Sequence, residues 1–68
     1  HCGLILDACR AGPKTATELV PVVFHRPLDP HQMGFAFSEV VAHVNCMRAR
    51  GEIVQVRDER GVLRQHLA

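Results

Sequence analysis

The sequence has no tryptophan and no tyrosine, and aromatic residues make up only 4% of its 68 residues. Hydrophobic residues still account for 47% of the chain. The core must therefore consist of leucine, isoleucine, valine and methionine, supplemented by three phenylalanines. A domain of this size has too little interior to enclose so much apolar surface. We therefore expect part of that surface to lie against another domain or subunit.

The sequence also lacks an excess of either charge. Eight lysines and arginines nearly balance seven aspartates and glutamates, which gives a net charge of +1 with histidine neutral. A domain that mainly binds nucleic-acid phosphates usually has a clear basic excess. The composition therefore gives no support to nucleic-acid binding, although it does not exclude it.

Long apolar runs and a dense cysteine pattern are absent as well. No run approaches the roughly 18 apolar residues of a membrane span, and no signal peptide is recognisable, so no membrane partner is expected. The three cysteines, Cys2, Cys9 and Cys46, are odd in number and not densely spaced, which argues against a secreted disulfide scaffold. We expect reduced thiols in a cytoplasmic protein.

The chain begins at His1 without a methionine, and no internal repeat or low-complexity segment divides it. We expect residues 1–68 to form a single domain that is a fragment of a longer protein.

Two short helices are predicted in the first part of the chain. Apolar residues recur at helical spacing over residues 2–11, and the glycine-proline pair at 12–13 ends that pattern. Thr15 and Glu18 have the spacing of a capping box, so a second helix should begin at Ala16.

Pro21 lies inside this second helix. It removes one main-chain hydrogen bond and costs about 3 kcal/mol in a regular helix interior. We therefore expect a short or kinked helix that ends near Phe24 or His25, followed by a connector stiffened by Pro27.

The strongest helix signals bound the stretch from Asp29 to Gly51. Asp29 is the expected N-cap, Pro30 occupies the first helical position and Gln32 completes a capping box. The predicted helix runs to Arg50, and Gly51 ends it.

A β-hairpin is predicted after this helix. Residues 52–57 and 62–67 are rich in strand formers, and a polar loop over residues 58–61 joins them. A third short strand around Lys14 would support the pair, since an isolated hairpin is only marginally stable. The order of elements predicts an α+β, mostly helical fold: a winged helix-turn-helix with three helices and a two- to three-stranded β wing.

The long helix has two apolar faces. At about 100° per residue, Met33, Ala36, Phe37, Val44 and Met47 fall within about 60° of Val40, and this stripe is the predicted inner face. The opposite face carries Phe35, Ser38, Ala42, Asn45 and Ala49, with Glu39 and Cys46 beside it.

A DNA-reading helix needs basic or amide side chains on that outward face. Here most side chains are small and neutral, and Glu39 has the wrong charge for phosphates. We therefore predict a protein-contact surface. Its expected members are Phe35, Ser38, Glu39, Ala42, His43 and Asn45.

His43 permits two chemical interpretations besides a structural one. With Cys46, three residues on, it could supply two metal ligands, but such a site needs further ligands, so we predict no metal here. With Glu39, four residues earlier, it could form a hydrogen bond along the helix or half of a general-base pair. No nucleophile accompanies them, so we predict a structural pair and no catalytic residue.

Arg57, Arg60 and Arg64 lie on or near the predicted wing, where arginines can contact phosphates. Asp58 and Glu59 offset their charge locally, which favours a solvated hairpin tip. The trio remains the best candidate for an alternative function in nucleic-acid binding.

The chain resembles the small winged-helix domain that ends many metallo-β-lactamase-fold hydrolases. The resemblance covers about residues 4–67 and depends on the order and spacing of several short motifs. These are Ile5-Leu6, Gly12-Pro13-Lys14-Thr15, Glu18-Leu19, Arg26-Pro27-Leu28-Asp29-Pro30-His31-Gln32, Glu39, Ala42-His43-Val44 and Arg50-Gly51-Glu52.

The resemblance implies a parent protein that is a zinc-dependent hydrolase of thioesters, phosphodiesters or related esters. The family's metal signature, His-x-His-x-Asp-His, belongs to the preceding catalytic domain and is absent from these 68 residues. The resemblance therefore implies no cofactor and no catalysis in this domain. Its implied partner is the catalytic domain, with a second copy of the chain as the alternative. Glu39 and His43 match positions of the family's pattern as structural or contact residues.

Overall fold

Three helices and one β-hairpin make up the computed structural model, which describes residues 2–68. The elements are α1 (Cys2–Arg10), α2 (Ala16–Val23), α3 (Pro30–Ala49), β1 (Ile53–Arg57) and β2 (Leu63–Leu67). The predicted α+β, mostly helical fold with a small wing is confirmed. Each element lies within two residues of its predicted bounds.

Both predicted capping boxes are present. At the start of α2, the Thr15 Oγ1 atom accepts from the Glu18 main-chain N–H at 3.1 Å, and Glu18 Oε1 accepts from the Thr15 N–H at 2.8 Å. At the start of α3, Asp29 Oδ1 accepts from the Gln32 N–H at 2.7 Å, and Gln32 Oε1 accepts from the Asp29 N–H at 3.2 Å. Each box satisfies two helix-end donors, which fixes where these helices begin.

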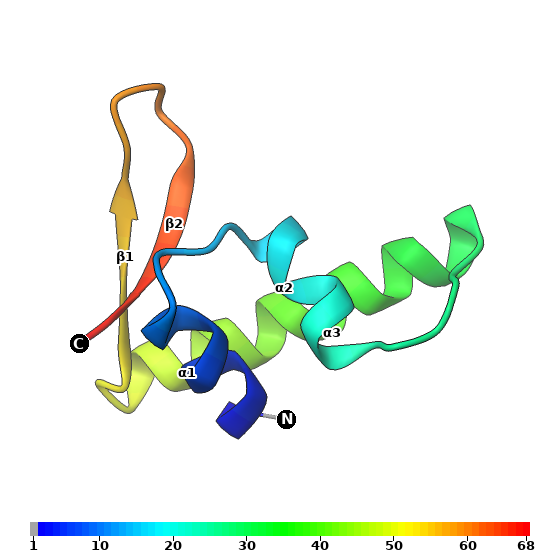
Figure 1. Cartoon of the computed structure of the whole chain (residues 1–68), viewed down its shortest axis with the longest axis horizontal. Helices are drawn as coiled ribbons and strands as arrows, with labels where there is room; N and C mark the ends of the chain where they lie inside the picture. The colour runs from blue at the N-terminus through cyan, green and yellow to red at the C-terminus, as the bar shows by residue number, and fades with distance from the viewer. Residues whose placement is uncertain (1) are drawn as a thin grey trace.

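The end of α3 leads directly into the hairpin. Gly51 has a φ of +75°, a left-handed conformation that glycine adopts without steric cost. The reversal brings the Glu52 N–H to the carbonyl of Met47 at 3.0 Å. β1 therefore begins beside the carboxyl-terminal end of α3 (Figure 1).

The wing, defined here as residues 53–67, is an antiparallel pair in which Ile53 lies opposite Leu67 and Gln55 opposite Gln65. A third segment joins it: Lys14 exchanges main-chain hydrogen bonds with Gln65 at 3.1 and 2.6 Å. At the place where a third short strand was predicted, the structure therefore has an isolated bridge, and the sheet itself has two strands. β2 lies between this segment and β1, so it is the central strand.

The core lies where α1 and α2 cover one side of α3, and the wing closes the carboxyl-terminal end of that helix (Figure 1). All three helices and β1 contribute. The buried apolar residues are Ile5, Cys9, Leu19, Val20, Val23, Ala36, Val40, Val44, Met47 and Ile53.

Two residues of the predicted inner face of α3 are not buried. Met33 is 43% exposed and Phe37 is 40% exposed. The first turns of α3, which include Met33, extend beyond α2 (Figure 1). Phe37 lies at the open border between the start of α2 and the wing, beside Val41 and Leu63. Periodicity identifies a face of a helix, but it does not show how far neighbouring elements cover that face.

Among the described helices, none combines the length and the apolar character needed to cross a membrane.

Candidate protein-contact surface

The outer face of α3 consists of Phe35, Ser38, Ala42, Asn45 and Ala49, all exposed. None of these five side chains carries a charge. Phe35 is 67% exposed, more than any other large hydrophobic residue described. Covering this ring with a partner would remove its apolar surface from water, which is favourable.

Phe35 also borders a hollow formed where the α2–α3 connector meets α3. The hollow has a volume of about 190 Å³. Its apolar lining comes from Phe24, Leu28, Phe35 and Ala36, with Arg26, His31 and Gln32 at its polar side. The outer face of α3 is therefore not flat at its amino-terminal end, and the hollow could receive a side chain from a partner.

The polar groups near this face are occupied within the helix itself. Ser38 donates its hydroxyl to the Gly34 carbonyl at 3.1 Å. His43 donates from Nδ1 to the main-chain carbonyl of Glu39 at 2.7 Å, so the neutral ring has its proton on Nδ1. Glu39 and His43 are both half-buried. His43 therefore contacts the Glu39 main chain, while the structural pairing of the two side chains stays a prediction.

Cys46 is exposed whereas His43 is half-buried, so the pair considered as metal ligands occupies two different environments. Within residues 2–68, no three histidine, cysteine, aspartate or glutamate side chains lie close enough together to hold a metal ion.

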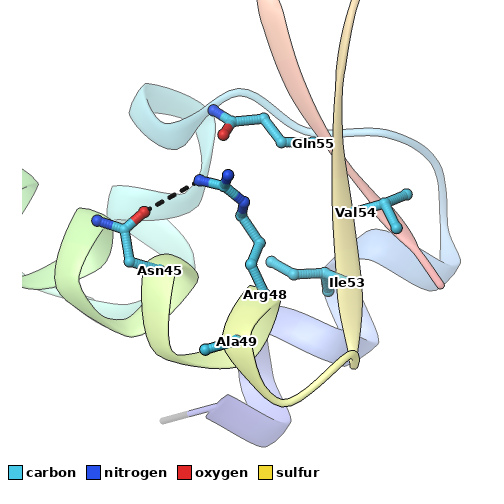
Figure 2. A pocket seen from close by; sticks show the side chains of 6 residues that line it. All are labelled: Asn45, Arg48, Ala49, Ile53, Val54 and Gln55. Carbon is cyan, nitrogen blue, oxygen red and sulfur yellow. Dashed lines mark hydrogen bonds between the residues drawn. The ribbon is translucent and has the colours of Figure 1, made fainter.

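A shallow groove continues this surface between the end of α3 and β1 (Figure 2). It has a volume of about 550 Å³ and is lined by Asn45, Arg48, Ala49, Ile53, Val54 and Gln55. Arg48 extends from α3 towards Gln55, and its Nη1 donates to Asn45 Oδ1 at 3.2 Å (Figure 2). Because Asn45 belongs to both, the outer face of α3 and the groove form one continuous surface.

Two of the three wing arginines are engaged in hydrogen bonds within the domain, although Arg60 and Arg64 line one shallow pocket with Asp58 and Glu59. Arg57 donates to the Gly61 carbonyl at 2.8 Å. Arg64 donates to Asp58 Oδ2 at 3.0 Å and to Glu18 Oε1 at 3.2 Å. Of the three, only Arg60 has a guanidinium with no hydrogen-bond partner among the described residues. Two of the predicted trio are therefore engaged in holding the wing together.

This chain belongs to the metallo-beta-lactamase-like C-terminal domain family. The family model matches residues 2–68. A solved relative, the crystal structure of a beta-lactamase domain protein from Burkholderia ambifaria, is 38% identical with a TM-score of 0.90. The match covers 98% of this chain and 20% of that chain, so this C-terminal domain spans one fifth of the relative's length. The comparison with curated proteins gave no significant match.

The family assigned from the order and spacing of motifs is thus confirmed. Several of those motifs are the capping and turn residues of this C-terminal domain: Thr15 and Glu18 begin α2, Asp29 begins α3, and Gly51 ends it. They specify how the helices are joined, which explains why their spacing is informative even though each motif alone is common.

Asp58 was not singled out from the sequence, yet it organises the hairpin loop. Its carboxylate accepts from the main-chain N–H groups of Arg60 at 2.8 Å and Val62 at 3.0 Å, and from the Arg64 side chain. These bonds, first that of Val62 and then that of Arg64, lower the pKa of Asp58. Aspartate at the first and glycine at the fourth position of the loop are typical of a type I turn, which is the signal that could have found it.

Gln65 is the second residue that sequence reasoning missed. It is 1% exposed, and its side-chain Oε1 has no hydrogen-bond partner among the described residues. The alternation of the strand places it between Leu63 and Leu67 on the same face. That position predicts burial, but nothing in the sequence indicates that the amide oxygen lacks a donor.

Proposed function

We propose that this chain is a C-terminal winged-helix accessory domain of a metallo-β-lactamase-superfamily hydrolase. The domain packs on the catalytic domain of the parent protein, or on a second subunit, and is not catalytic by itself. Zinc and the reacting groups belong to the catalytic domain.

The observation that carries this proposal is the outer face of α3. Its side chains are small or apolar, none of the five carries a charge, and Phe35 is 67% exposed. Interface cores are depleted in charged residues and enriched in aromatic ones. A helix at this position in a DNA-binding domain would instead present cations and amides to the groove.

The solved relative adds support from its length. Its title names a beta-lactamase domain protein, and the present domain corresponds to one fifth of that chain. A domain of this family therefore occurs beside a larger part, which offers a partner for the outer face of α3. An equivalent neighbour is what we propose for this chain.

The free thiols support a cytoplasmic location. Cys2, Cys9 and Cys46 are not joined in disulfides, and burial raises the pKa of the Cys9 thiol. A protonated, enclosed thiol is inert, which suits a reducing compartment.

A nucleic-acid-binding module is the second candidate, and the exposed Arg60 is the observation that favours it. The same loop carries Asp58 and Glu59, which repel phosphates. Binding of a DNA duplex or an RNA strand that falls steeply with salt and is lost in Arg60→Ala would support this candidate.

The proposed contact is tested by expressing the catalytic domain and this domain separately and measuring their association by gel filtration. Ala42→Arg together with Ala49→Arg places two cations on the outer face of α3 and should abolish co-elution. Ala11→Arg, also at an exposed alanine but outside that face, is the matched control and should co-elute normally. Unchanged co-elution of the double variant would refute the proposed surface.

A further inference from the structure

β1 is the free edge of the wing, and the register shows which of its residues face outward. In an antiparallel ladder, residues alternate between pairs that exchange main-chain hydrogen bonds and pairs that do not. Gln65 uses its N–H and C=O on Lys14, so its pair with Gln55 is of the second kind. Ile53 and Arg57, two residues before and two after Gln55, are also in pairs that do not exchange main-chain hydrogen bonds. All three residues therefore direct their main-chain groups away from β2.

The hydrogen bonds that flank the ladder agree with this alternation. The Asp58 N–H donates to the Val62 carbonyl at 2.9 Å, and the Ala68 N–H donates to the Glu52 carbonyl at 3.2 Å. Even-numbered residues of this segment thus bond across the hairpin. Among residues 2–68, the outward main-chain groups of β1 have no hydrogen-bond partner, which makes this edge a template for another strand.

The groove beside this edge supplies side-chain chemistry. Ile53 and Ala49 give it an apolar floor, and Arg48 extends across it towards Gln55 (Figure 2). The only hydrogen bond of the Arg48 guanidinium within the described chain goes to the amide oxygen of Asn45, and no carboxylate pairs with it. One of the five N–H donors of this guanidinium is used, and the four that remain suit a carboxylate.

We infer that the edge of β1 and the groove together bind an extended polypeptide segment that carries an aspartate or glutamate. The segment joins the wing as an additional strand through the main-chain groups of Ile53, Gln55 and Arg57. Side chains of a strand alternate between faces, so those on the Gln55 side enter the groove and one carboxylate meets Arg48. Those on the other side lie next to Val54 and Val56, each 45% exposed, and are apolar.

This inference goes beyond the proposed function, because it concerns the edge of β1 and the Arg48 side chain and does not require a catalytic domain. The groove shares only Asn45 and Ala49 with the outer face of α3. The charges favour an acidic protein segment over other occupants. Two copies of the chain joined edge to edge would bring together two Arg48 side chains, and the groove lining contains no carboxylate to offset them. Nucleic acid would need an array of cations, whereas the groove has one.

The test uses the 68-residue chain as bait for a random dodecapeptide library displayed on phage. Selected peptides should contain one acidic residue within an alternating β-branched pattern. Binding of the synthesised peptides should weaken about tenfold or more in Arg48→Ala, as expected for a lost charge-assisted hydrogen bond. Arg10→Ala, an exposed arginine on α1, is the matched control and should bind as the unaltered chain does.

The strand geometry is tested by amide hydrogen exchange with the selected peptide bound. The Gln55 and Arg57 amides should become protected, and Gln55→Pro, which removes an outward N–H without breaking the ladder, should weaken binding. If the proline variant does not fold, the peptide affinity of Arg48→Ala still tests the inference. The inference would be overturned if Arg48→Ala bound the peptide with unchanged affinity, or if the peptide gave no new protection of the β1 amides. It would also be overturned if protection appeared on raising the chain concentration without peptide, or if a DNA duplex displaced the peptide.

Discussion

Arg64 and Glu18 lie 46 residues apart in the sequence, and their side chains meet at 3.2 Å. The same guanidinium holds Asp58 at 3.0 Å. Arg64 therefore connects the start of α2 to the hairpin loop, and its role is to position the wing on the helices.

This role predicts that Arg64→Gln lowers the melting temperature by a few degrees and detaches the wing from α2. A double-mutant cycle with Glu18→Gln should show coupling between the two positions. Arg10→Gln is the control: its partner Asp7 is one helical turn away and both side chains are 66% exposed, so the melting temperature should hardly change. Additive effects of Arg64→Gln and Glu18→Gln in thermal melts would contradict the proposed connection.

Acid should weaken the domain through two carboxylates. The Val62 N–H and the Arg64 side chain lower the pKa of Asp58, and the main-chain N–H of Thr15 is the first cause of the lowered pKa of Glu18. A carboxyl group with a lower pKa in the folded chain adds stability that is complete above its unfolded pKa. This stability should be lost as the pH falls from about 4 towards the lower folded values.

The measurement is the urea midpoint as a function of pH. The double variant Asp58→Asn with Glu18→Gln should be less stable than the unaltered chain near neutrality and should lose less on acidification. Glu59→Gln, next to Asp58 but without a hydrogen bond to its carboxylate among the described residues, is the control. Equal acid slopes in the double variant and the unaltered chain would count against this explanation.

The two methionines of α3 should differ strongly in their contribution to stability. Met47 is 0% exposed and Met33 is 43% exposed. Met47→Ala should reduce the free energy of unfolding by about 2–5 kcal/mol, whereas Met33→Ala should cost well under about 1 kcal/mol. Chemical denaturation of both variants measures the difference, and comparable losses would mean that Met33 packs more tightly than its exposure indicates.

Two glycines, one inside α3 and one just after its end, should have opposite effects on stability when replaced by alanine. Gly51 has a φ of +75°, so Gly51→Ala should destabilise the fold by about 1–2 kcal/mol. Gly34 lies inside the helix with nothing within 4 Å of an added Cβ, so Gly34→Ala should stabilise it by about 0.5–1 kcal/mol. Thermal melts of the two variants provide the comparison. A stabilised Gly51→Ala would mean that the turn can adopt another conformation.

Replacing Gln65 with an apolar residue should not harm the domain. Its buried Oε1 has no donor among the described residues, and an unsatisfied buried acceptor costs about 1–3 kcal/mol. Gln65→Met keeps the volume and removes that cost, so the free energy of unfolding should rise or stay equal. Gln55→Met, at the half-buried position directly opposite, is the control. A marked loss in Gln65→Met alone would indicate that the amide is satisfied by bound water.

The helix and strand boundaries could be predicted from the sequence because the signals that set them are local. Capping boxes at Thr15 and Asp29 and the glycine at 51 specify helix ends without reference to the rest of the chain. The exposure of Met33 and Phe37 could not be predicted in this way, since it depends on how far α2 and the wing reach along α3. The engagement of Arg64 with Glu18 is likewise a contact between distant segments, which no residue pattern reports.

The candidate surface was likewise predicted only where local signals define it. Helical periodicity correctly placed Phe35, Ser38, Ala42 and Asn45 on an exposed face of α3, although their role as contacts remains a prediction. The groove at Arg48 was not foreseen, because it exists only where the start of β1 lies beside the end of α3. Predicting what it could bind also requires the pairing register, which shows which main-chain groups of β1 are not hydrogen-bonded to β2.

The bridge between Lys14 and Gln65 has a consequence for the order in which the domain folds. The capping boxes of α2 and α3 are local signals that each segment carries as soon as it is synthesised. The central strand of the wing, however, must close a loop that spans most of the chain, and such non-local pairing is slow. β2 can therefore pair with β1 and with Lys14 only after Gln65 has left the ribosome, and until then both edges of β1 are unpaired.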